Sequence, residues 1–341
     1  MITLGLLTHT SERMFIFSLI SFGFAMLLTP IYTHFAYKHK LWKRHRTHST
    51  TGEALKVISS MRIKRNVPIM AGLITLIAVS IVTLIWNLSR HQTWLPLAGF
   101  LGGGLVGLID DVINIRGTGG KFAGLAPRVK FIMIAFVASV AALFFYYKLG
   151  INFIHLPYFN NINVGWGIIP IFVLVVVSTG NAVNISDGMD GLAGGLLLSA
   201  YGAYAVIALL QDNFGIAIFC MTILGALLSY LWFNIPPARF FMGDVGSFSL
   251  GTALGVIAMM TGTLALLPII GFVFVAEAGS TLIQVLSKKI FHRKIFIAAP
   301  IHHHFEATGW PKTKVTMRFW IIGQVSAILG VMFALIGGYI H

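Results

Sequence analysis

Residues 166–183 read WGIIPIFVLVVVSTGNAV, a stretch of 18 residues without a charged side chain. A helix of about 20 apolar residues is long enough to cross the ~30 Å hydrocarbon core of a bilayer. Nine further, largely apolar stretches lie at 14–36, 68–88, 95–109, 130–149, 190–210, 214–233, 246–263, 266–287 and 318–340. The sequence therefore predicts an all-α, polytopic membrane protein with about ten transmembrane helices.

The overall composition excludes a soluble globular protein. Hydrophobic residues make up 57% of the chain, charged residues make up 10%, and the mean hydropathy is +0.86. A soluble domain carries roughly 25% charged residues, so too few are present here to cover a water-exposed surface. No separate soluble domain fits between the apolar stretches, so we expect a single membrane domain over residues 1–341. The one cysteine, Cys220, excludes an internal disulfide and a thiolate metal cluster.

The basic residues predict the orientation of the helices. Of the 24 Lys and Arg residues, 21 fall on one side of the predicted membrane, and only Arg13, Arg90 and Lys148 fall on the other. Because loops rich in Lys and Arg stay in the cytoplasm, both termini are expected outside. The cytoplasmic loops are then about 37–67, 110–129, 184–189, 234–245 and 288–317. These loops explain the net charge of +14, so we expect no nucleic-acid partner.

Aspartates gather at the predicted cytoplasmic helix ends, at Asp110, Asp111, Asp187, Asp190 and Asp244. Carboxylates beside hydrocarbon are costly, and they usually occur paired or in functional sites. Asp187 and Asp244 could instead cap the helices that follow them. The adjacent Asp110 and Asp111 are harder to explain as caps, because two like charges repel unless a cation lies between them. Oxygen ligands without cysteine favour Mg²⁺ or Mn²⁺ over zinc.

The last large basic loop contains three consecutive histidines, in Pro300-Ile-His-His-His-Phe-Glu306. Histidines at a cytoplasmic membrane edge are suited to hold phosphate or to assist proton transfer. Two other interpretations remain open at this point: a loop bound at the membrane interface, and metal binding by the histidines themselves.

The interiors of the predicted helices offer two further signals. Glu277 is the one acidic residue well inside a predicted span, whereas a secondary transporter should carry its coupling carboxylates near the midplane on repeated, broken helices. Gly103 and Gly107 form a G-x-x-x-G pattern, which favours close packing against another helix. Both signals favour an enzyme at the membrane edge over a transporter.

Four blocks of sequence together resemble the polyprenyl-phosphate N-acetylhexosamine-1-phosphate transferase superfamily. They are GLIDD at 107–111, NAVNISDGMDGLAGG at 181–195, FFMGDVGSFSLG at 240–251 and PIHHHFEATGW at 300–310. The blocks follow the order of the family over nearly the whole chain. One stretch departs from the family pattern: a TPTMGG-like segment reads VPIMAG at 67–72, which lacks two hydroxyls and one glycine.

The resemblance implies an activity, partners and a location. The histidine block is similar to the branch that transfers phospho-MurNAc-pentapeptide from UDP-MurNAc-pentapeptide to undecaprenyl phosphate, giving lipid I and UMP. The alternative is a sister transferase that uses UDP-GlcNAc. Either activity implies Mg²⁺, with Mn²⁺ as a substitute, membrane lipid as a partner and a multi-pass protein of the bacterial plasma (inner) membrane with its active site at the cytoplasmic face. A homodimer is a further expectation from the family.

The resemblance also implies roles for individual residues, by their positions in the motifs. The catalytic residues would be Asp110, Asp111, Asp244 and His303. The metal ligands would be Asp244, Asp187 and Asp110. The substrate-binding residues would be Lys64, Lys130, Asn184, Asp187, Asp190, Asn234, Phe241, Gln284, His302 and His304.

Overall fold

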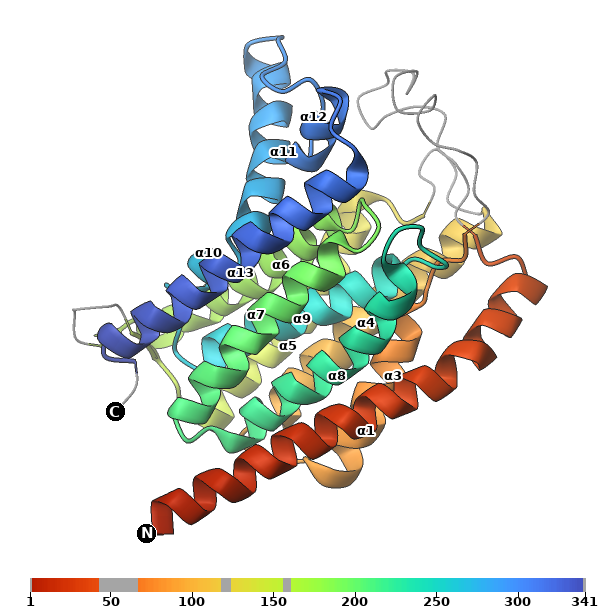
Figure 1. Cartoon of the computed structure of the whole chain (residues 1–341). Coiled ribbons are helices and arrows are strands. Elements are labelled where there is room, and N and C mark those ends of the chain that lie inside the picture. The colour runs from red at the N-terminus through yellow and green to blue at the C-terminus, as the bar shows by residue number, and fades with distance from the viewer. Residues whose placement is uncertain (1, 43–66, 118–123, 156–160, 340–341) are drawn as a thin grey trace.

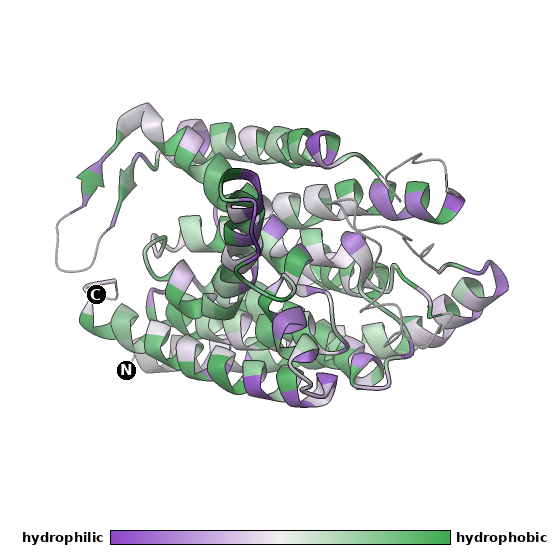
Figure 2. Ribbon diagram, turned by 90° about the horizontal axis from the view of Figure 1, so that it is seen from above, coloured by the Kyte–Doolittle hydropathy of each residue, from purple (hydrophilic) through white to green (hydrophobic). Residues whose placement is uncertain are grey.

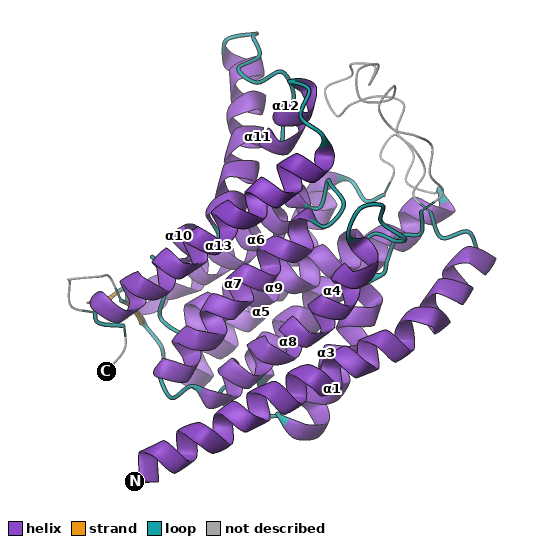
Figure 3. Cartoon of the chain, viewed as in Figure 1, coloured by secondary structure: helices purple, strands orange, loops and turns teal. Residues whose placement is uncertain are grey.

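The computed structural model describes residues 2–42, 67–117, 124–155 and 161–339, apart from the side chains of residues 2–8. Lys64, a predicted substrate-binding residue, lies outside the described residues. Helices make up nearly all of the fold (Figure 3). They are α1 (Ile2–Lys38), α3 (Gly72–Trp86), α4 (Trp94–Arg116), α5 (Pro127–Leu149), α6 (Ile168–Ser186), α7 (Leu192–Leu210), α8 (Phe214–Asn234), α9 (Gly243–Met260), α10 (Leu267–Ile270), α11 (Phe272–Ile290), α12 (Ile301–Ala307) and α13 (Lys312–Ile336).

Eight of the described helices are long and apolar enough to cross a membrane: α1, α4, α5, α6, α7, α8, α9 and α13. The helix α3 is apolar but only 15 residues long. The structure therefore confirms a predominantly helical, polytopic protein. The predicted span at 266–287 is divided by Gly271 into the short α10 and the longer α11, which projects from the bundle in Figure 1.

Helix α9 lies at the centre of the bundle and contacts α3, α4, α6 and α7. It is the most enclosed of the eight long helices: 89% of its most apolar 18-residue stretch is buried inside the protein. Small residues make this possible: a Cβ on Gly251 would lie 2.7 Å from the Cα of Gly180 in α6. In a bilayer, helices associate mainly through such close packing. The central helix is therefore held rigidly, and its first turn carries Asp244.

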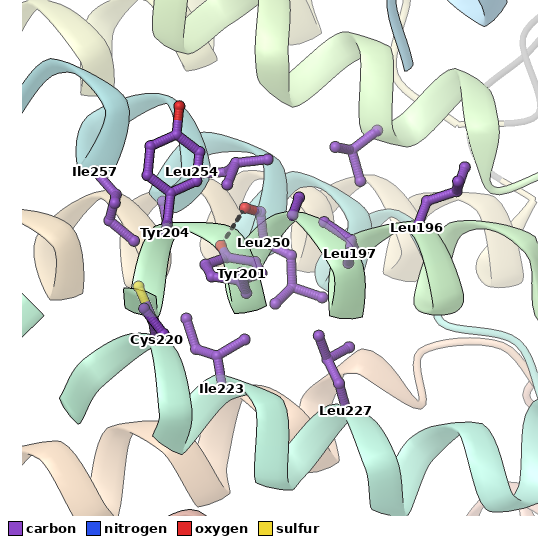
Figure 4. Close-up of a cluster of buried hydrophobic side chains, with 14 of the residues drawn as sticks. Leu196, Leu197, Tyr201, Tyr204, Cys220, Ile223, Leu227, Leu250, Leu254 and Ile257 are labelled. Atoms are coloured by element: carbon purple, nitrogen blue, oxygen red, sulfur yellow. Dashed lines mark hydrogen bonds between the residues drawn. The ribbon is translucent and has the colours of Figure 1, made fainter. Parts of the chain in front are cut away.

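A cluster of buried side chains between α7, α8 and α9 holds the middle of the bundle together (Figure 4). The Tyr201 hydroxyl donates a 2.6 Å hydrogen bond to the backbone oxygen of Leu250 within this cluster. A buried hydroxyl without a partner would cost free energy in an apolar interior, and this bond avoids that cost. Cys220 lies in the same cluster and is fully buried.

The two ends of the bundle differ. The start of α1 and the end of α13 lie at one end (Figure 1), where β1 (Phe153–Ile154) and β2 (Ile162–Asn163) form an antiparallel hairpin. The Tyr339 hydroxyl, just after α13, donates to the backbone oxygen of His155 in this hairpin region at 3.5 Å. Most residues of the helices are hydrophobic (Figure 2). Asp111, near the end of α4, and Asp244, in the first turn of α9, lie together at the opposite end.

Candidate active site

Three buried carboxylates meet where α4 ends and α9 begins. Asp110, Asp111 and Asp244 each offer one oxygen, and these oxygens all lie within 4.8 Å of one another. Lys130, in the first turn of α5, places its Nζ 2.9 Å from Asp110 Oδ2 and 2.6 Å from Asp244 Oδ2. We call these four residues the acidic pocket. A buried cation between carboxylates offsets their repulsion, which explains how they can lie so close together.

A glycine stripe on α4 brings its backbone against α9. A Cβ at Gly103 would lie 2.6 Å from the backbone oxygen of Phe248, and a Cβ at Gly107 would collide with the backbone of Asp244. Asp111 continues this stripe one turn further, since residues four apart share a helix face. The prediction that the G-x-x-x-G pattern serves close packing is confirmed, and this packing carries Asp111 to the start of α9.

Asp111 binds the start of α9 from outside that helix. Its Oδ2 accepts a 3.0 Å hydrogen bond from the backbone N–H of Val245, one of the groups that a helix leaves unsatisfied at its N-terminus. The N-cap position of α9 is Met242, and no side-chain cap bond forms there. Gly243 has a positive φ of 74°, and a Cβ at this position would lie 2.6 Å from Asp111 Oδ2. Capping of α9 is therefore done by Asp111, which leaves the Asp244 side chain directed to Lys130.

Asp110 is held by the segment that precedes α5. The backbone N–H of Leu125 donates a 2.6 Å hydrogen bond to Asp110 Oδ1, while Oδ2 accepts from Lys130. Both oxygens of this carboxylate are thus engaged by residues that follow it in the chain.

The end of α6 and the loop that follows it are bonded to α9 and to residues 234–238. Asn184 Nδ2 donates to Ser247 Oγ at 2.8 Å, one turn after Asp244. Asp190 Oδ2 accepts from the backbone N–H of Ala238 at 3.1 Å, and Asn234 Oδ1 accepts from Gly191 N at 2.8 Å. Asn184, Asp190 and Asn234 therefore join three segments that are distant in sequence. Asp187, a predicted metal ligand, belongs to the same loop but is not one of the three grouped carboxylates.

The VPIMAG segment at 67–72 contacts this region through its backbone. Phe241 N donates to the Pro68 oxygen at 2.8 Å, and Ala71 N donates to the Phe241 oxygen at 3.0 Å. The Tyr32 hydroxyl donates to the backbone oxygen of Ile69. The segment contributes only backbone groups to these three bonds, so the two missing hydroxyls do not affect them. Gly72 is retained where a Cβ would collide with Gly246.

Helix α11 carries a buried polar face and an exposed apolar face. Glu277, Ser280, Gln284 and Ser287 are buried, and their spacing of three, four and three places them on one side of the helix. The opposite side exposes apolar residues at Leu282, Ile283, Leu286 and Ile290. We call the four buried residues the polar ladder. This arrangement suits a helix whose outer face contacts lipid and whose inner face holds polar chain.

Each residue of the polar ladder bonds the chain that follows α11. Glu277 Oε2 lies 2.7 Å from His302 Nδ1, and Ser280 Oγ accepts from Ile301 N at 3.0 Å. Gln284 Oε1 accepts from the backbone N–H groups of Ile295 and Phe296, while its Nε2 donates to the Phe296 oxygen. Ser287 Oγ donates to the Arg293 oxygen at 2.9 Å. The ladder therefore holds residues 293–302. We call residues 293–307, which include all of α12, the histidine arm.

The three predicted histidines have different surroundings. His302 is fully buried. His303 Nδ1 lies 3.0 Å from Glu306 Oε2 at the partly exposed side of α12, and this hydrogen bond is the main reason that the pKa of Glu306 is lowered. His304 Nδ1 accepts from the Ile297 backbone N–H at 3.3 Å. His302 is therefore enclosed by the protein, whereas His303 and His304 are only partly buried.

The structure brings together some of the predicted site residues. Asp110, Asp111, Asp244 and Lys130 meet directly, and the Asn184–Asp190 loop adjoins them through Asn184. Gln284 bonds the histidine arm. The sequence did not predict the polar ladder as a set, nor the hydrogen bond from Tyr32 to Ile69. A stripe of polar residues spaced three and four apart in an apolar helix was the available signal for the ladder.

The donor atoms of the acidic pocket fit a hard divalent cation. All three of its ligand groups are carboxylates, and they are buried within reach of a single ion. Hard cations prefer oxygen ligands of this kind. The ammonium group of Lys130 between Asp110 and Asp244 marks a position where positive charge is stabilised. The pocket could therefore bind a metal ion.

The fold defines a multi-pass membrane protein with a buried acidic pocket at one end, and the family match places it among the transferases. Residues 93–262, which span α4 to α9, match the family described as glycosyl transferase family 4.

Curated relatives agree over a greater length. The chain is 38% identical to the phospho-N-acetylmuramoyl-pentapeptide-transferase of Chloroflexus aggregans, over 98% of this chain and 93% of the relative. It is 36% identical to the protein of the same name from Geobacillus sp. (strain WCH70), over 92% of this chain and 95% of the relative. A third relative of that name, from Thermodesulfovibrio yellowstonii, is 38% identical over 79% of this chain. The chain belongs to the phospho-N-acetylmuramoyl-pentapeptide transferase family.

Proposed function

We propose that the chain transfers phospho-MurNAc-pentapeptide from UDP-MurNAc-pentapeptide to undecaprenyl phosphate, giving lipid I and UMP, with the acidic pocket as its reaction centre. The observation that carries this proposal is the meeting of three buried carboxylates with Lys130 at one end of an apolar bundle. A lipid phosphate can reach this end while its tail stays in the bilayer. A water-soluble nucleotide can reach it from the aqueous side.

The pocket has the parts that phosphoryl transfer requires. Such transfer depends mainly on positioning the phosphates and neutralising the charge on their oxygens. Lys130 supplies a fixed positive charge between Asp110 and Asp244, on helices whose packing leaves little freedom. Lys64 is a second proposed contact to the nucleotide.

A divalent cation completes this assignment. Asp110 and Asp244 would hold Mg²⁺, or Mn²⁺ as a substitute, with Asp187 as the third proposed ligand. When bound, the cation neutralises oxygen charge on the diphosphate. Asp111 lies in the same group of carboxylates, but its bond to Val245 N gives it a second task, because it fixes the helix that carries Asp244.

The proposed catalytic set also includes Asp110, Asp111 and His303, and the substrate contacts include Asn184, Asp190 and Phe241. Asn184 and Asp190 are held by hydrogen bonds to Ser247 and Ala238, so they present fixed polar groups beside the pocket. Fixed groups favour catalysis because they need no rearrangement as charge develops.

We further propose ten membrane crossings with both termini outside, α3 and the α10–α11 pair adding to the eight long helices. The position of the start of α1 and the end of α13 at one end of the bundle supports this topology (Figure 1). Single cysteines at Thr308 and His91, both exposed, test it after Cys220 is replaced by alanine. Thr308→Cys should react only from the cytoplasmic side and His91→Cys only from outside. The reverse pattern would contradict the proposed inner-membrane orientation.

The assay that tests the activity follows UMP release by purified protein with undecaprenyl phosphate and Mg²⁺. UDP-MurNAc-pentapeptide should be converted, and UDP-GlcNAc at the same concentration should not. Conversion of UDP-GlcNAc instead would assign the chain to the sister activity.

A further inference from the structure

Glu277 and His302 form a hydrogen-bonded pair that is unusual for its burial. Both residues are 0% exposed, and the atoms that join them lie 2.7 Å apart. The hydrogen bond joins Nδ1 of His302 to Oε2 of Glu277. This bond fixes the orientation of the imidazole ring, because a carboxylate on one ring nitrogen sets where the other nitrogen points.

The second ring nitrogen of His302 points at the loop that follows α6. A Cβ built on Gly188 would collide with Nε2 and would lie 2.8 Å from Cε1 of the same ring. Among the described residues, neither Nε2 of His302 nor Oε1 of Glu277 has a hydrogen-bond partner, although both atoms are buried. Buried polar atoms without partners are costly, so natural proteins rarely keep them without a reason.

The ring therefore links two parts of the molecule that are far apart in sequence. Glu277 belongs to α11 and His302 to α12, whereas Gly188 lies between Asp187 and Asp190 in the loop beside the acidic pocket. Asn184, in the last turn of α6 just before that loop, donates a hydrogen bond to Ser247 of α9. The position of the ring is thus transmitted to the loop by direct contact, and glycine at 188 is the residue that permits the contact.

We propose that Glu277 is a positioning residue: through His302 it holds the Asp187–Asp190 loop in the geometry that binds the nucleotide-sugar donor, and Gly188 is the contact point. The proposal rests on the proposed function, in which this loop contributes to the donor site. In this proposal His302 affects donor binding by holding the loop in place. Glu277 orients His302, whereas the other residues of the polar ladder only hold the histidine arm.

The rest of the ladder provides the comparison that separates positioning from support. Ser280 lies on the same face of α11 and tethers the start of α12 through Ile301 N. Within the described residues, its side chain forms no hydrogen bond with the loop after α6. If Glu277 only tethered the histidine arm, loss of Ser280 Oγ and loss of the Glu277 carboxylate would have the same kind of effect.

The experiment measures KM for UDP-MurNAc-pentapeptide and for undecaprenyl phosphate, by UMP release, in variants of the full chain. Glu277→Leu should raise the donor KM about tenfold, the scale of one hydrogen bond to a charged group, and should leave the KM for undecaprenyl phosphate unchanged. Glu277→Gln keeps an acceptor oxygen and should restore the donor KM to within about threefold of the unmodified chain. Ser280→Ala should leave the donor KM unchanged while lowering the temperature of unfolding.

Gly188→Ala approaches the same contact from the loop side and does not alter α11. It should also raise the donor KM about tenfold, because the added methyl group displaces the ring. Gly202→Ala is the matched control, since a Cβ there meets open space. Gly188→Ala combined with Glu277→Leu should raise KM little more than either change alone, because both break one linkage.

Three outcomes would overturn the proposal. The donor KM could be unchanged in Gly188→Ala, or Ser280→Ala could raise the donor KM as much as Glu277→Leu does. The third is a donor KM in the double variant that rises by the product of the two single effects. If Glu277→Leu does not fold, Gly188→Ala and Glu277→Gln still decide the matter. An unmodified chain that releases no UMP would instead count against the proposed function itself, so the two failures can be told apart.

Discussion

The acidic pocket and the polar ladder both place polar groups at the edge of an apolar bundle, but they are built differently. The pocket depends on backbones in contact: Gly107 and Gly243 leave room for α4, α9 and Asp111 to meet. The ladder depends on side chains that bond backbone groups of a following segment, as Gln284 does with Ile295 and Phe296. In the acidic pocket, closely packed helix backbones hold the charged side chains in place. In the polar ladder, separate hydrogen bonds hold a segment of the chain in place. We therefore expect substitutions in the pocket to abolish chemistry, and substitutions in the ladder to alter positioning by degrees.

The largest effect should follow Asp244→Asn. Asparagine keeps the size of the side chain but removes the charge that a cation and Lys130 require, so UMP release should fall about 1000-fold. The temperature of unfolding should stay close to that of the unmodified chain, because Asp111 rather than Asp244 caps α9. Turnover measured across a Mg²⁺ titration checks this, and near-normal turnover at ordinary Mg²⁺ would remove Asp244 from the metal site.

His303→Ala tests whether the histidine arm contributes to chemistry at all. His303 is a proposed catalytic residue and is only partly buried, so its loss should lower kcat about 100-fold with little effect on folding. The measurement is kcat at saturating donor, with circular dichroism on the same sample. Full activity in the variant would mean that the acidic pocket alone carries out the chemistry and that the histidine arm serves only in binding.

Gln284→Ala should have an intermediate effect. The side chain makes three hydrogen bonds to the backbone of residues 295 and 296, so its loss should raise the hydrogen-exchange rate of this segment about tenfold. Activity should fall by a similar factor. Exchange that stays slow while nucleotide affinity drops would mean that Gln284 contacts the nucleotide itself, and the contrast between the two regions would then weaken.

The smallest effect should follow Glu306→Gln. The hydrogen bond from His303 lowers the pKa of Glu306 below its ordinary value of 4.5, so the carboxylate stabilises the folded state once it is ionised. This stabilisation is present above pH ~4.5 and is lost as the pH falls through the lower pKa of the folded state. At pH 7 the variant should be less stable by at most about 1 kcal/mol, and this difference should shrink when the pH is lowered to 3. Thermal unfolding at both pH values checks the sign, and a difference that grows in acid would contradict it.

The two regions also differ in how far they could be predicted from the sequence. The aspartates of the pocket stood out because carboxylates are rare in so apolar a chain, and the G-x-x-x-G pattern correctly indicated close packing. The pairing of Lys130 with Asp110 and Asp244 could not be read, because it depends on how α5 lies against α4 and α9. The break at Gly271 was missed because the apolar run continues across it. Glu277 was read as a single acidic residue inside a span, whereas its role emerges only with His302, which lies 25 residues further along the chain.

The polar ladder affects the order in which parts of the protein can fold during synthesis. Every residue of the acidic pocket precedes residue 245, so the pocket can be complete while the ribosome is still adding the last helices. The ladder finds its partners only in residues 293–302, which are synthesised after α11 itself. Until then α11 carries four polar side chains without their bonds, which disfavours its stable residence beside lipid. The acidic pocket can thus form first, and the newly made chain gains the histidine triplet His302 to His304 only when synthesis is nearly finished.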